Sequence, residues 1–272
     1  MSAKKSLGQH FLTCRWVADT LIRAADIGHR DTVLEIGPGT GALTYCLAAA
    51  AGRVIAVEKD ERLASQLKGA LKKEGINNVE IILGDALSIF QTKSGIGISR
   101  LSLELGDYKI VANIPYYLTS HLLRLVLEHK PRPKLIALTI QKEVARRMVA
   151  RPPHMNLLAL SVQAYGTPEI IKTVPSSCFS PQPKVDSAII KISGISDIFF
   201  QKNALGREEF FRLIRAGFGQ KRKQLANTLA TIVGDKKRAE NMLRAADINP
   251  ASRPEELSLI QWAELCRATV RD

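Results

Sequence analysis

The stretch TVLEIGPGTG at residues 32–41 joins a short apolar run, rich in β-branched residues, to three glycines. Glycines at the end of a buried strand let the chain turn sharply and let a ligand approach the main chain closely. A helical segment follows, and the order strand, glycine loop, helix predicts a nucleotide-like cofactor site in an α/β fold. The spacing is G-x-G-x-G and not the dinucleotide pattern G-x-G-x-x-G, whose last position is occupied by Ala42.

Around this stretch, residues 32–193 alternate between strand-like runs and segments with helical spacing. The further strand-like runs are 53–57, 79–83, 109–113, 135–140, 158–162 and 185–192. Helical spacing is found at 60–73 and 118–129. This alternation predicts a parallel sheet with helices on both faces. The last two runs have no long helix between them, which favours an antiparallel pair at the end of the sheet.

The pattern changes to helices alone after Gly206. The expected helices are 208–218, 221–233, 236–246 and 257–270, separated by Gly and Pro signals. Residues 194–203 show no period and are interpreted as a linker, and 91–107 are interpreted as a loop or insertion. The sequence therefore predicts two domains, an α/β domain at 1–195 and a small all-helical domain at 203–272.

Composition and charge restrict the class of protein. Of 272 residues, 46% are hydrophobic and 24% are charged, which excludes wholesale disorder, a collagen-like rod and a membrane bundle. The formal net charge is +13. Such an excess favours a polyanionic partner, either nucleic acid or an anionic membrane surface, over a protein that is merely basic.

The cysteines and the N-terminus bear on the compartment. Cys14, Cys46, Cys178 and Cys266 lie far apart, with no C-x-x-C pair and no His cluster. We therefore expect no metal site and no disulfide scaffold, and a reducing compartment. The first residues lack the apolar stretch of a signal peptide, and the longest apolar run is too short to span a bilayer. These features predict a soluble cytoplasmic protein.

Two acidic residues follow the next strands at positions that suit an adenosine. Glu58 ends the second strand, where an acid accepts hydrogen bonds from both hydroxyls of a ribose. Asp85 follows the third strand, where it can accept a hydrogen bond from the amine of an adenine. The phosphate-binding motif G-x-x-x-x-G-K-[ST] is absent from the sequence. The predicted cofactor is S-adenosylmethionine, an adenosine without phosphates; the alternative is that these acids only cap ordinary loops.

The fourth strand ends in Asn113-Ile114-Pro115-Tyr116, at the sheet edge where the cofactor loop lies. Methylation of an adenine amine needs acceptors that grip its hydrogens and localise its lone pair. Asn113 offers a side-chain carbonyl, Pro115 fixes the direction of the neighbouring main-chain carbonyl, and Tyr116 offers a flat face for the base. Because a sulfonium methyl is already a strong electrophile, positioning can supply most of the rate and no strong general base is required. The alternative is a turn that merely ends a strand.

Several segments together closely resemble the KsgA/RsmA-type small-subunit ribosomal RNA adenine N6,N6-dimethyltransferase family. They are LGQHFL (7–12), EIGPGTG (35–41), Glu58, Asp85, NIPY (113–116), FSPQPKVDS (179–187) and RAGFGQKRKQL (215–225). The resemblance covers essentially the whole chain. It implies a Rossmann-like class I methyltransferase sheet with a small all-helical C-terminal domain.

The resemblance also implies roles for matched residues. The implied cofactor contacts are His10 and Leu12 at the methionine part, Gly37 and Gly39 in the loop under it, Glu58 at the ribose, Asp85 at the adenine, and Asn113, which also touches the target amine. The implied catalytic residues are Asn113, Pro115, Tyr116 and Phe179. Tyr116 and Phe179 would sandwich the flipped adenine, and Pro181 and Pro183 predict a stiff exposed turn that presents Phe179.

Basic residues gather in two places. Residues 109–151 hold nine Lys or Arg against two Glu, including Arg146 and Arg147, and the tail contains Lys221, Arg222 and Lys223. Phosphate contacts of this kind supply salt-dependent affinity for RNA. The alternative is a solvated face. Because an enzyme that modifies a base must extrude it or take it from a loop, single-stranded RNA fits best.

We therefore expect dimethylation of two adjacent adenines near the 3′ end of 16S ribosomal RNA, within a pre-30S particle, by a monomer with no membrane partner. Three alternatives stay open. The first is a large-subunit adenine methyltransferase of the antibiotic-resistance type, and the second is a non-enzymatic ribosome-assembly or transcription factor. The third is an NAD-dependent oxidoreductase, against which the glycine spacing argues.

Overall fold

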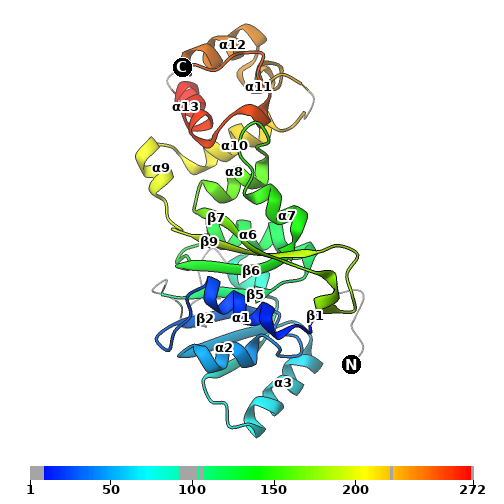
Figure 1. Ribbon diagram of the computed structural model, residues 1–272. Coiled ribbons are helices and arrows are strands. Elements are labelled where there is room, and N and C mark those ends of the chain that lie inside the picture. Colours follow the sequence, from blue (N-terminus) through cyan, green and yellow to red (C-terminus); the bar gives the residue numbers. More distant parts are fainter. Residues whose placement is uncertain (1–8, 92–102, 104–106, 221–222, 271–272) are drawn as a thin grey trace. The chain divides into compact units, whose positions relative to one another are not determined.

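The computed structural model describes residues 9–91, 103, 107–220 and 223–270 (Figure 1). The chain divides into two compact units. The first contains Met1–Ala145 and Thr167–Ile195, and the second contains Arg146–Gly166 and Ser196–Asp272. Each unit is described by itself below.

The first unit is built on a seven-stranded sheet in the order β4-β3-β2-β5-β6-β9-β7. Its strands are β2 (Thr32–Ile36), β3 (Arg53–Glu58), β4 (Val79–Leu83), β5 (Lys109–Asn113), β6 (Leu135–Gln141), β7 (Thr167–Val174) and β9 (Ser187–Ser193). Neighbours from β4 to β6 pair in parallel, whereas β9 pairs antiparallel with both β6 and β7. The predicted parallel sheet is confirmed, and it ends in antiparallel strands, but these are β7 and β9 and not the expected pair 158–162 and 185–192.

The chain order along the sheet reverses between β2 and β5. From β2 the chain proceeds outward to β3 and β4, and then returns to add β5 and β6 on the other side of β2. In open α/β sheets a crevice forms at such a point, outside the carboxyl ends of the strands. The topology thus places the loops after β2 and β5 beside each other.

Helices of the first unit bury apolar faces against this sheet. They are α1 (Arg15–Ala24), α2 (Thr44–Ala50), α3 (Glu61–Lys73), α4 (Ala86–Gln91) and α6 (Thr119–Glu128). On α3 the leucines at every fourth position, Leu63, Leu67 and Leu71, are buried, as the helical spacing predicts. Its first turn is capped by Asp60, whose carboxylate accepts a hydrogen bond from the backbone N–H of Arg62.

A second, two-stranded sheet ties the N-terminal segment to a distant part of the chain. Its strands are β1 (Phe11–Leu12) and β8 (Phe179–Ser180). A disulfide joins Cys14 and Cys178 next to this pairing. The expectation that the cysteines form no disulfide is therefore wrong. Their separation of 164 residues gives no local pattern by which the sequence could reveal the pair.

The second unit is helical throughout its described part. It contains α8 (Leu157–Gln163), α9 (Ile198–Asn203), α10 (Arg207–Gly217), α11 (Leu225–Val233), α12 (Lys236–Ala245) and α13 (Leu259–Val270), and α7 (Lys142–Met148) crosses its boundary. Trp262 is fully buried and stacks on Phe218. Gly217 is required there, because a Cβ would lie 2.3 Å from the Trp262 ring.

Several sequence expectations need correction. The run 158–162 is part of helix α8, whose first turn is capped by the Asn156 side chain, and not a strand. Strand β7 was not predicted, and the expected linker 194–203 contains α9. The expected helix 221–233 begins only at Leu225. Most of the expected loop at 91–107 lies outside the described residues.

The two units divide the chain differently from the predicted domains in one stretch. Residues Arg146–Gly166 go with the C-terminal helices because α8 packs on α10, and because Tyr165 lies against Phe200 and Phe211. The functional division into 1–195 and 203–272 stays a prediction. Within the described part of the chain, no helix combines the length and apolar character needed to cross a bilayer.

Candidate active site

A pocket opens at the carboxyl ends of the parallel strands in the first unit. It is lined by the loops that follow β2, β3, β4 and β5, together with the N-terminal segment and Phe179. All ten residues predicted to bind the cofactor or to act in catalysis line it: His10, Leu12, Gly37, Gly39, Glu58, Asp85, Asn113, Pro115, Tyr116 and Phe179. The structure thus brings these residues together, and their individual roles remain predictions.

The glycine loop after β2 has the backbone conformation that only glycine adopts easily. Gly37, Gly39 and Gly41 all have positive φ angles, +69°, +58° and +89°. A Cβ on Gly39 would also lie 3.1 Å from the Phe11 ring, so the N-terminal segment rests directly against the loop. The main chain of this loop therefore lines the pocket.

Glu58, at the end of β3, holds this loop in place. One carboxylate oxygen accepts a hydrogen bond from the backbone N–H of Gly39 at 3.0 Å, and the other accepts one from the backbone N–H of Asp60 at 2.8 Å. The residue is 6% exposed. Since each carboxylate oxygen has two lone pairs, Glu58 retains capacity to accept from a ligand hydroxyl.

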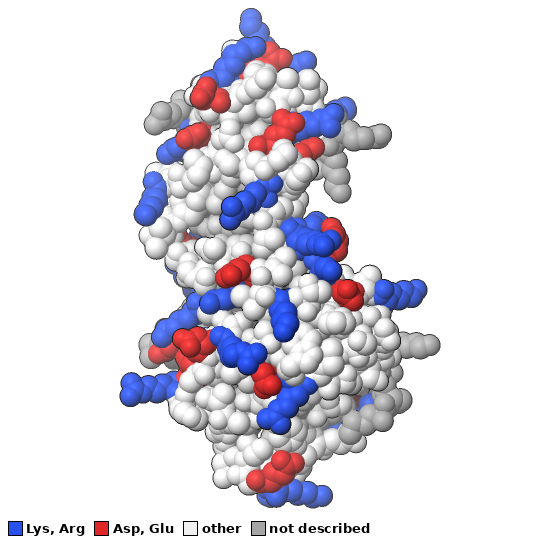
Figure 2. All heavy atoms as spheres, viewed as in Figure 1, with Lys and Arg blue, Asp and Glu red and all other residues white. Residues whose placement is uncertain are grey.

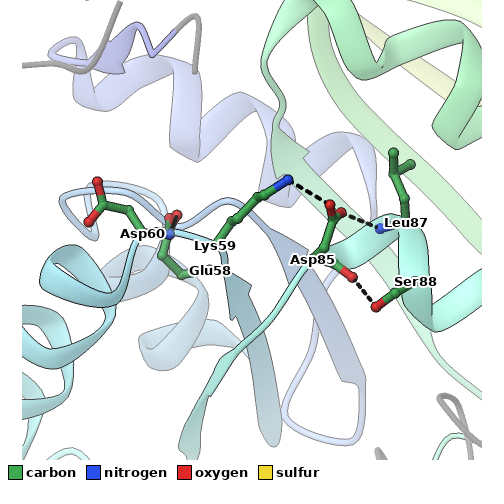
Figure 3. A network of polar contacts seen from close by, with 6 residues as sticks. All are labelled: Glu58, Lys59, Asp60, Asp85, Leu87 and Ser88. Atoms are coloured by element: carbon green, nitrogen blue, oxygen red, sulfur yellow. Dashed lines mark hydrogen bonds and ion pairs between the residues drawn. The ribbon is translucent and has the colours of Figure 1, made fainter. Parts of the chain in front are cut away.

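Asp85, after β4, is held by two donors (Figure 3). Lys59 reaches across from the end of β3 and places its Nζ 2.8 Å from one carboxylate oxygen, and the backbone N–H of Leu87 donates to the other at 3.0 Å. The hydrogen bond from Lys59 lowers the pKa of Asp85, burial opposes it, and the Leu87 N–H lowers it further. The result is an ionised, fixed acceptor at this end of the pocket.

Two further lining residues were not assigned a role from the sequence. Glu35 is fully buried, and burial raises its pKa to about 8; the Thr44 hydroxyl opposes this shift, and the charge of Glu58 adds to it. An acid inside an otherwise apolar strand is a signal that could have drawn attention to it. Lys59 gave no such signal, since an exposed lysine after a strand is common.

Asn113, at the end of β5, is oriented by the N-terminal segment. Its side-chain Nδ2 donates a hydrogen bond to the main-chain oxygen of His10 at 3.1 Å. Because Nδ2 is the atom that makes this bond, the side-chain carbonyl oxygen of Asn113 is not used in the contact with His10. The His10 ring in turn hydrogen-bonds through Nδ1 to the carbonyl oxygen of Pro181 and stacks on Tyr116, with centroids 5.5 Å apart.

The two predicted aromatic planes are both at the pocket. The Tyr116 hydroxyl lies 2.7 Å from the Ser187 Oγ, and burial raises the pKa of Tyr116. Phe179 is only 3% exposed. The expected exposed turn is therefore corrected in part: Pro181 is exposed, but Pro183 and Phe179 are buried, because β8 pairs with β1 and turns the ring inward.

The predicted RNA-binding residues lie elsewhere. Arg146 and Arg147 are exposed on α7 in the second unit, and Lys223 is exposed before α11. Lys221 and Arg222 lie outside the described residues. Figure 2 shows basic side chains interspersed with acidic ones on the face in view, and not a single continuous patch. The described residues contain no cluster of three or more side chains suited to hold a metal ion.

The groups in the pocket suit an adenosine that carries no phosphates. The backbone N–H of Gly39 already donates to the Glu58 carboxylate, so it is not available to hold a phosphate oxygen. A ribose and an adenine amine, by contrast, present the O–H and N–H donors that the carboxylates of Glu58 and Asp85 accept. These acceptors thus fit S-adenosylmethionine.

Comparisons with known proteins agree with this geometry. The model of the family described as ribosomal RNA adenine dimethylase matches residues 1–269. A Dehalococcoides mccartyi protein named ribosomal RNA small subunit methyltransferase A is 42% identical over 98% of this chain and 88% of its own length.

Two solved structures resemble the whole chain. A dimethyladenosine transferase from Plasmodium falciparum has a TM-score of 0.78 at 30% identity, covering 94% of this chain and 96% of its own. The 23S rRNA methyltransferase ErmE has a TM-score of 0.70 at 24% identity, covering 95% of this chain and 98% of its own, which supports the fold alone. The chain therefore belongs to the ribosomal RNA adenine dimethylase family, as an S-adenosylmethionine-dependent methyltransferase with a Rossmann-like sheet.

Proposed function

We propose that the protein dimethylates N6 of two adjacent adenines near the 3′ end of small-subunit (16S) ribosomal RNA during ribosome biogenesis. The observation that carries this proposal is a single pocket that holds both acceptors for an adenosine, Glu58 and Asp85, and the target-side residues Asn113, Tyr116 and Phe179. The names of the curated relatives favour the small subunit over the large one.

On the cofactor side, the chain's own groups bind and orient. Glu58 accepts hydrogen bonds from the ribose hydroxyls, and Asp85 accepts one from the adenine amine. The main chain at Gly37 and Gly39 lies under the methionine part, and His10 and Leu12 cover it. When bound, S-adenosylmethionine supplies an electrophilic methyl group on its sulfonium.

On the target side, the chain positions a weak nucleophile. The Asn113 side-chain carbonyl and the main-chain carbonyl before Pro115 accept hydrogen bonds from the target amine, which localises its lone pair toward the methyl group. Tyr116 and Phe179 hold the extruded base between their rings. The nitrogen would gain the methyl as the sulfonium C–S bond of S-adenosylmethionine is cleaved, which would leave S-adenosylhomocysteine, and it would release its proton to water. Positioning and electrostatics would then carry the rate without a strong general base.

RNA docking is assigned to basic residues outside the pocket. Arg146, Arg147 and Lys223 are exposed, as phosphate contacts require, and we assign Lys221 and Arg222 to the same role. The helical domain at 203–272 then docks the RNA while the domain at 1–195 carries the chemistry. The substrate is a pre-30S particle, and the protein acts as a cytoplasmic monomer.

The test is transfer of labelled methyl from S-adenosylmethionine to under-methylated 30S particles and, in parallel, to naked large-subunit RNA. Nucleoside analysis then identifies the product. We expect N6,N6-dimethyladenosine in the small-subunit RNA only. Label in the large-subunit RNA would instead identify an enzyme of the resistance type, and bound cofactor without any label would identify a non-enzymatic assembly factor.

A further inference from the structure

The disulfide between Cys14 and Cys178 lies where two walls of the pocket meet. Leu12 and Phe179 both line the pocket, and they face each other in the β1–β8 pairing. Cys14 lies two residues after Leu12, and Cys178 directly precedes Phe179. The covalent bond therefore links the segment that covers the cofactor to the segment that carries a target-side ring.

Apart from this bond, the N-terminal segment is held over the pocket by non-covalent contacts, which include the burial of Leu12 and the stacking of His10 on Tyr116. The β1–β8 pairing involves only two residues on each strand. Beside it, the backbone N–H of Thr13 donates to the carbonyl of Cys178 at 2.9 Å, His10 bonds to Pro181, and Asn113 bonds to His10. A short edge pairing of this kind opens locally at low cost when no covalent link holds it.

The pair is accessible to exchange from one side. Cys14 is partly exposed, at the residue that precedes α1, whereas Cys178 is 4% exposed. Of the two residues, Cys14 is therefore the one more accessible to a small thiol or disulfide in solution. The other two cysteines, Cys46 and Cys266, are free thiols.

We propose that Cys14 and Cys178 form a reversible redox modification site whose state sets how fast cofactor leaves the pocket. In the disulfide state, Leu12 is pinned beside Phe179 and the segment Gln9–Leu12 stays over the pocket. In the dithiol state, this segment lifts away by breaking the two-residue pairing, the contacts of His10 and the packing of Leu12. The inference rests on the proposed placement of the cofactor in this pocket.

The chemistry is thiol–disulfide exchange with a low-molecular-weight disulfide such as oxidised glutathione. The two cysteine thiols give one protein disulfide, and the small disulfide gives two small thiols. Two electrons pass from the cysteine sulfurs to the external disulfide, and both protons go with them. An excess of reduced small thiol reverses the reaction.

The test measures dissociation of S-adenosylhomocysteine by displacement, with the full-length protein equilibrated in oxidised or in reduced glutathione. Thiol titration and mass spectrometry of unreduced peptides verify the bond. We expect release to be at least about tenfold slower in the oxidised protein, because the disulfide prevents local opening of the segment Gln9–Leu12. A protein that releases the ligand equally fast with the bond verified as closed, or that keeps four titratable thiols in oxidised glutathione, overturns the proposal.

Matched variants separate this role from general stabilisation. Cys14→Ser with Cys178→Ser should release ligand fast in both buffers, whereas Cys46→Ser should keep the full redox response. A disulfide that only stabilises the fold would raise the melting temperature in oxidised glutathione while the release rate stayed the same. If Asp85→Asn leaves cofactor affinity unchanged, the proposed cofactor placement fails; if it weakens binding but redox has no effect on release, only this inference fails.

Discussion

The two sides of the pocket are built from different chemistry. On the cofactor side, two carboxylates are each fixed by two donors: Glu58 by backbone N–H groups, and Asp85 by Lys59 and a backbone N–H. On the target side the groups are neutral: the Asn113 amide, held by the main chain of His10, and the rings of Tyr116 and Phe179.

This difference separates binding from chemistry. In the proposed placement, the fixed carboxylates would recognise O–H and N–H donors that are present in the cofactor throughout the reaction, and so would contribute to ground-state affinity. The proposed target side would act on a nitrogen whose geometry changes as the methyl arrives, so its contribution would be largest in the transition state. Asn113, which is also a predicted cofactor contact, would contribute to both. Substitutions on the two sides should therefore change different quantities.

The largest effect is expected for Asn113→Ala. Loss of the carbonyl that grips the target amine should lower the rate constant for methyl transfer about 10²- to 10³-fold, the range seen when one preorganised electrostatic partner is removed. RNA affinity should be almost unchanged, because Asn113 is not among the residues proposed to contact phosphates. Single-turnover transfer and RNA binding to the same preparation check this. Full activity in the variant would contradict the proposed hydrogen bond between the Asn113 carbonyl and the target amine.

Asp85→Asn should act on the opposite side. Replacing an ionised acceptor by an amide should weaken cofactor binding about 10- to 100-fold, since hydrogen bonds to charged groups are the stronger ones. Calorimetric titration with S-adenosylhomocysteine measures this. Asp107→Asn is the matched control, because Asp107 also pairs with a lysine, Lys134, but does not line the pocket.

Phe179→Leu should raise the KM for RNA about tenfold, because base–aromatic stacking is worth roughly 1–3 kcal/mol and leucine retains only part of it. The free energy of unfolding should fall too, since the ring is buried. Phe200→Leu, at a ring buried in the second unit, controls for this loss. An equal rise in KM for both variants would remove Phe179 from the target side.

Changing Lys221, Arg222 and Lys223 to Ala should weaken RNA binding most at low salt. If each contacts one phosphate, the slope of log affinity against log salt should fall by about 2, at roughly 0.7 per contact on a single strand. Lys72→Ala with Lys73→Ala, on the last turn of α3, is the control. An unchanged slope in the triple variant would mean that these charges only face solvent.

The smallest effect is expected for Lys59→Met. The hydrogen bond from Lys59 lowers the pKa of Asp85, so in the native protein Asp85 stays ionised, and cofactor binding persists, to lower pH. Removing Lys59 should raise this pKa and move the acid limb of cofactor binding to higher pH, with little change near neutrality, where the Asp85 carboxyl is ionised in both proteins. Lys59→Arg should restore the native profile. A pH profile identical in Lys59→Met and native protein would show that Lys59 does not tune the site.

Much of the sheet could be predicted from local sequence patterns. The strand predictions that are wrong have physical reasons. The run 158–162 is predicted as a strand from its apolar pattern, but leucine and alanine favour a helix once Asn156 caps it, and the run lies in α8. Strand β7 was missed because it contains Pro168 and several polar residues. Both suit an edge strand, and β7 lies at the end of the sheet.

The candidate site could also be predicted only in part. Residues at the carboxyl ends of parallel strands, such as Gly37, Glu58 and Asn113, could be placed together from strand order alone. Contacts made by side chains across the fold could not. Lys59 reaches Asp85 from another strand, and Cys14 meets Cys178 only because β1 pairs with β8.

The most direct test of the division between the two sides is single-turnover methyl transfer at saturating S-adenosylmethionine, with native protein, Asn113→Ala and Asp85→Asn compared on the same 30S substrate. Saturation compensates a loss of cofactor affinity but not a loss of target positioning. We predict that Asp85→Asn transfers methyl at close to the native rate, while Asn113→Ala remains slower by about 10²-fold or more. Equal losses in the two variants would contradict the account.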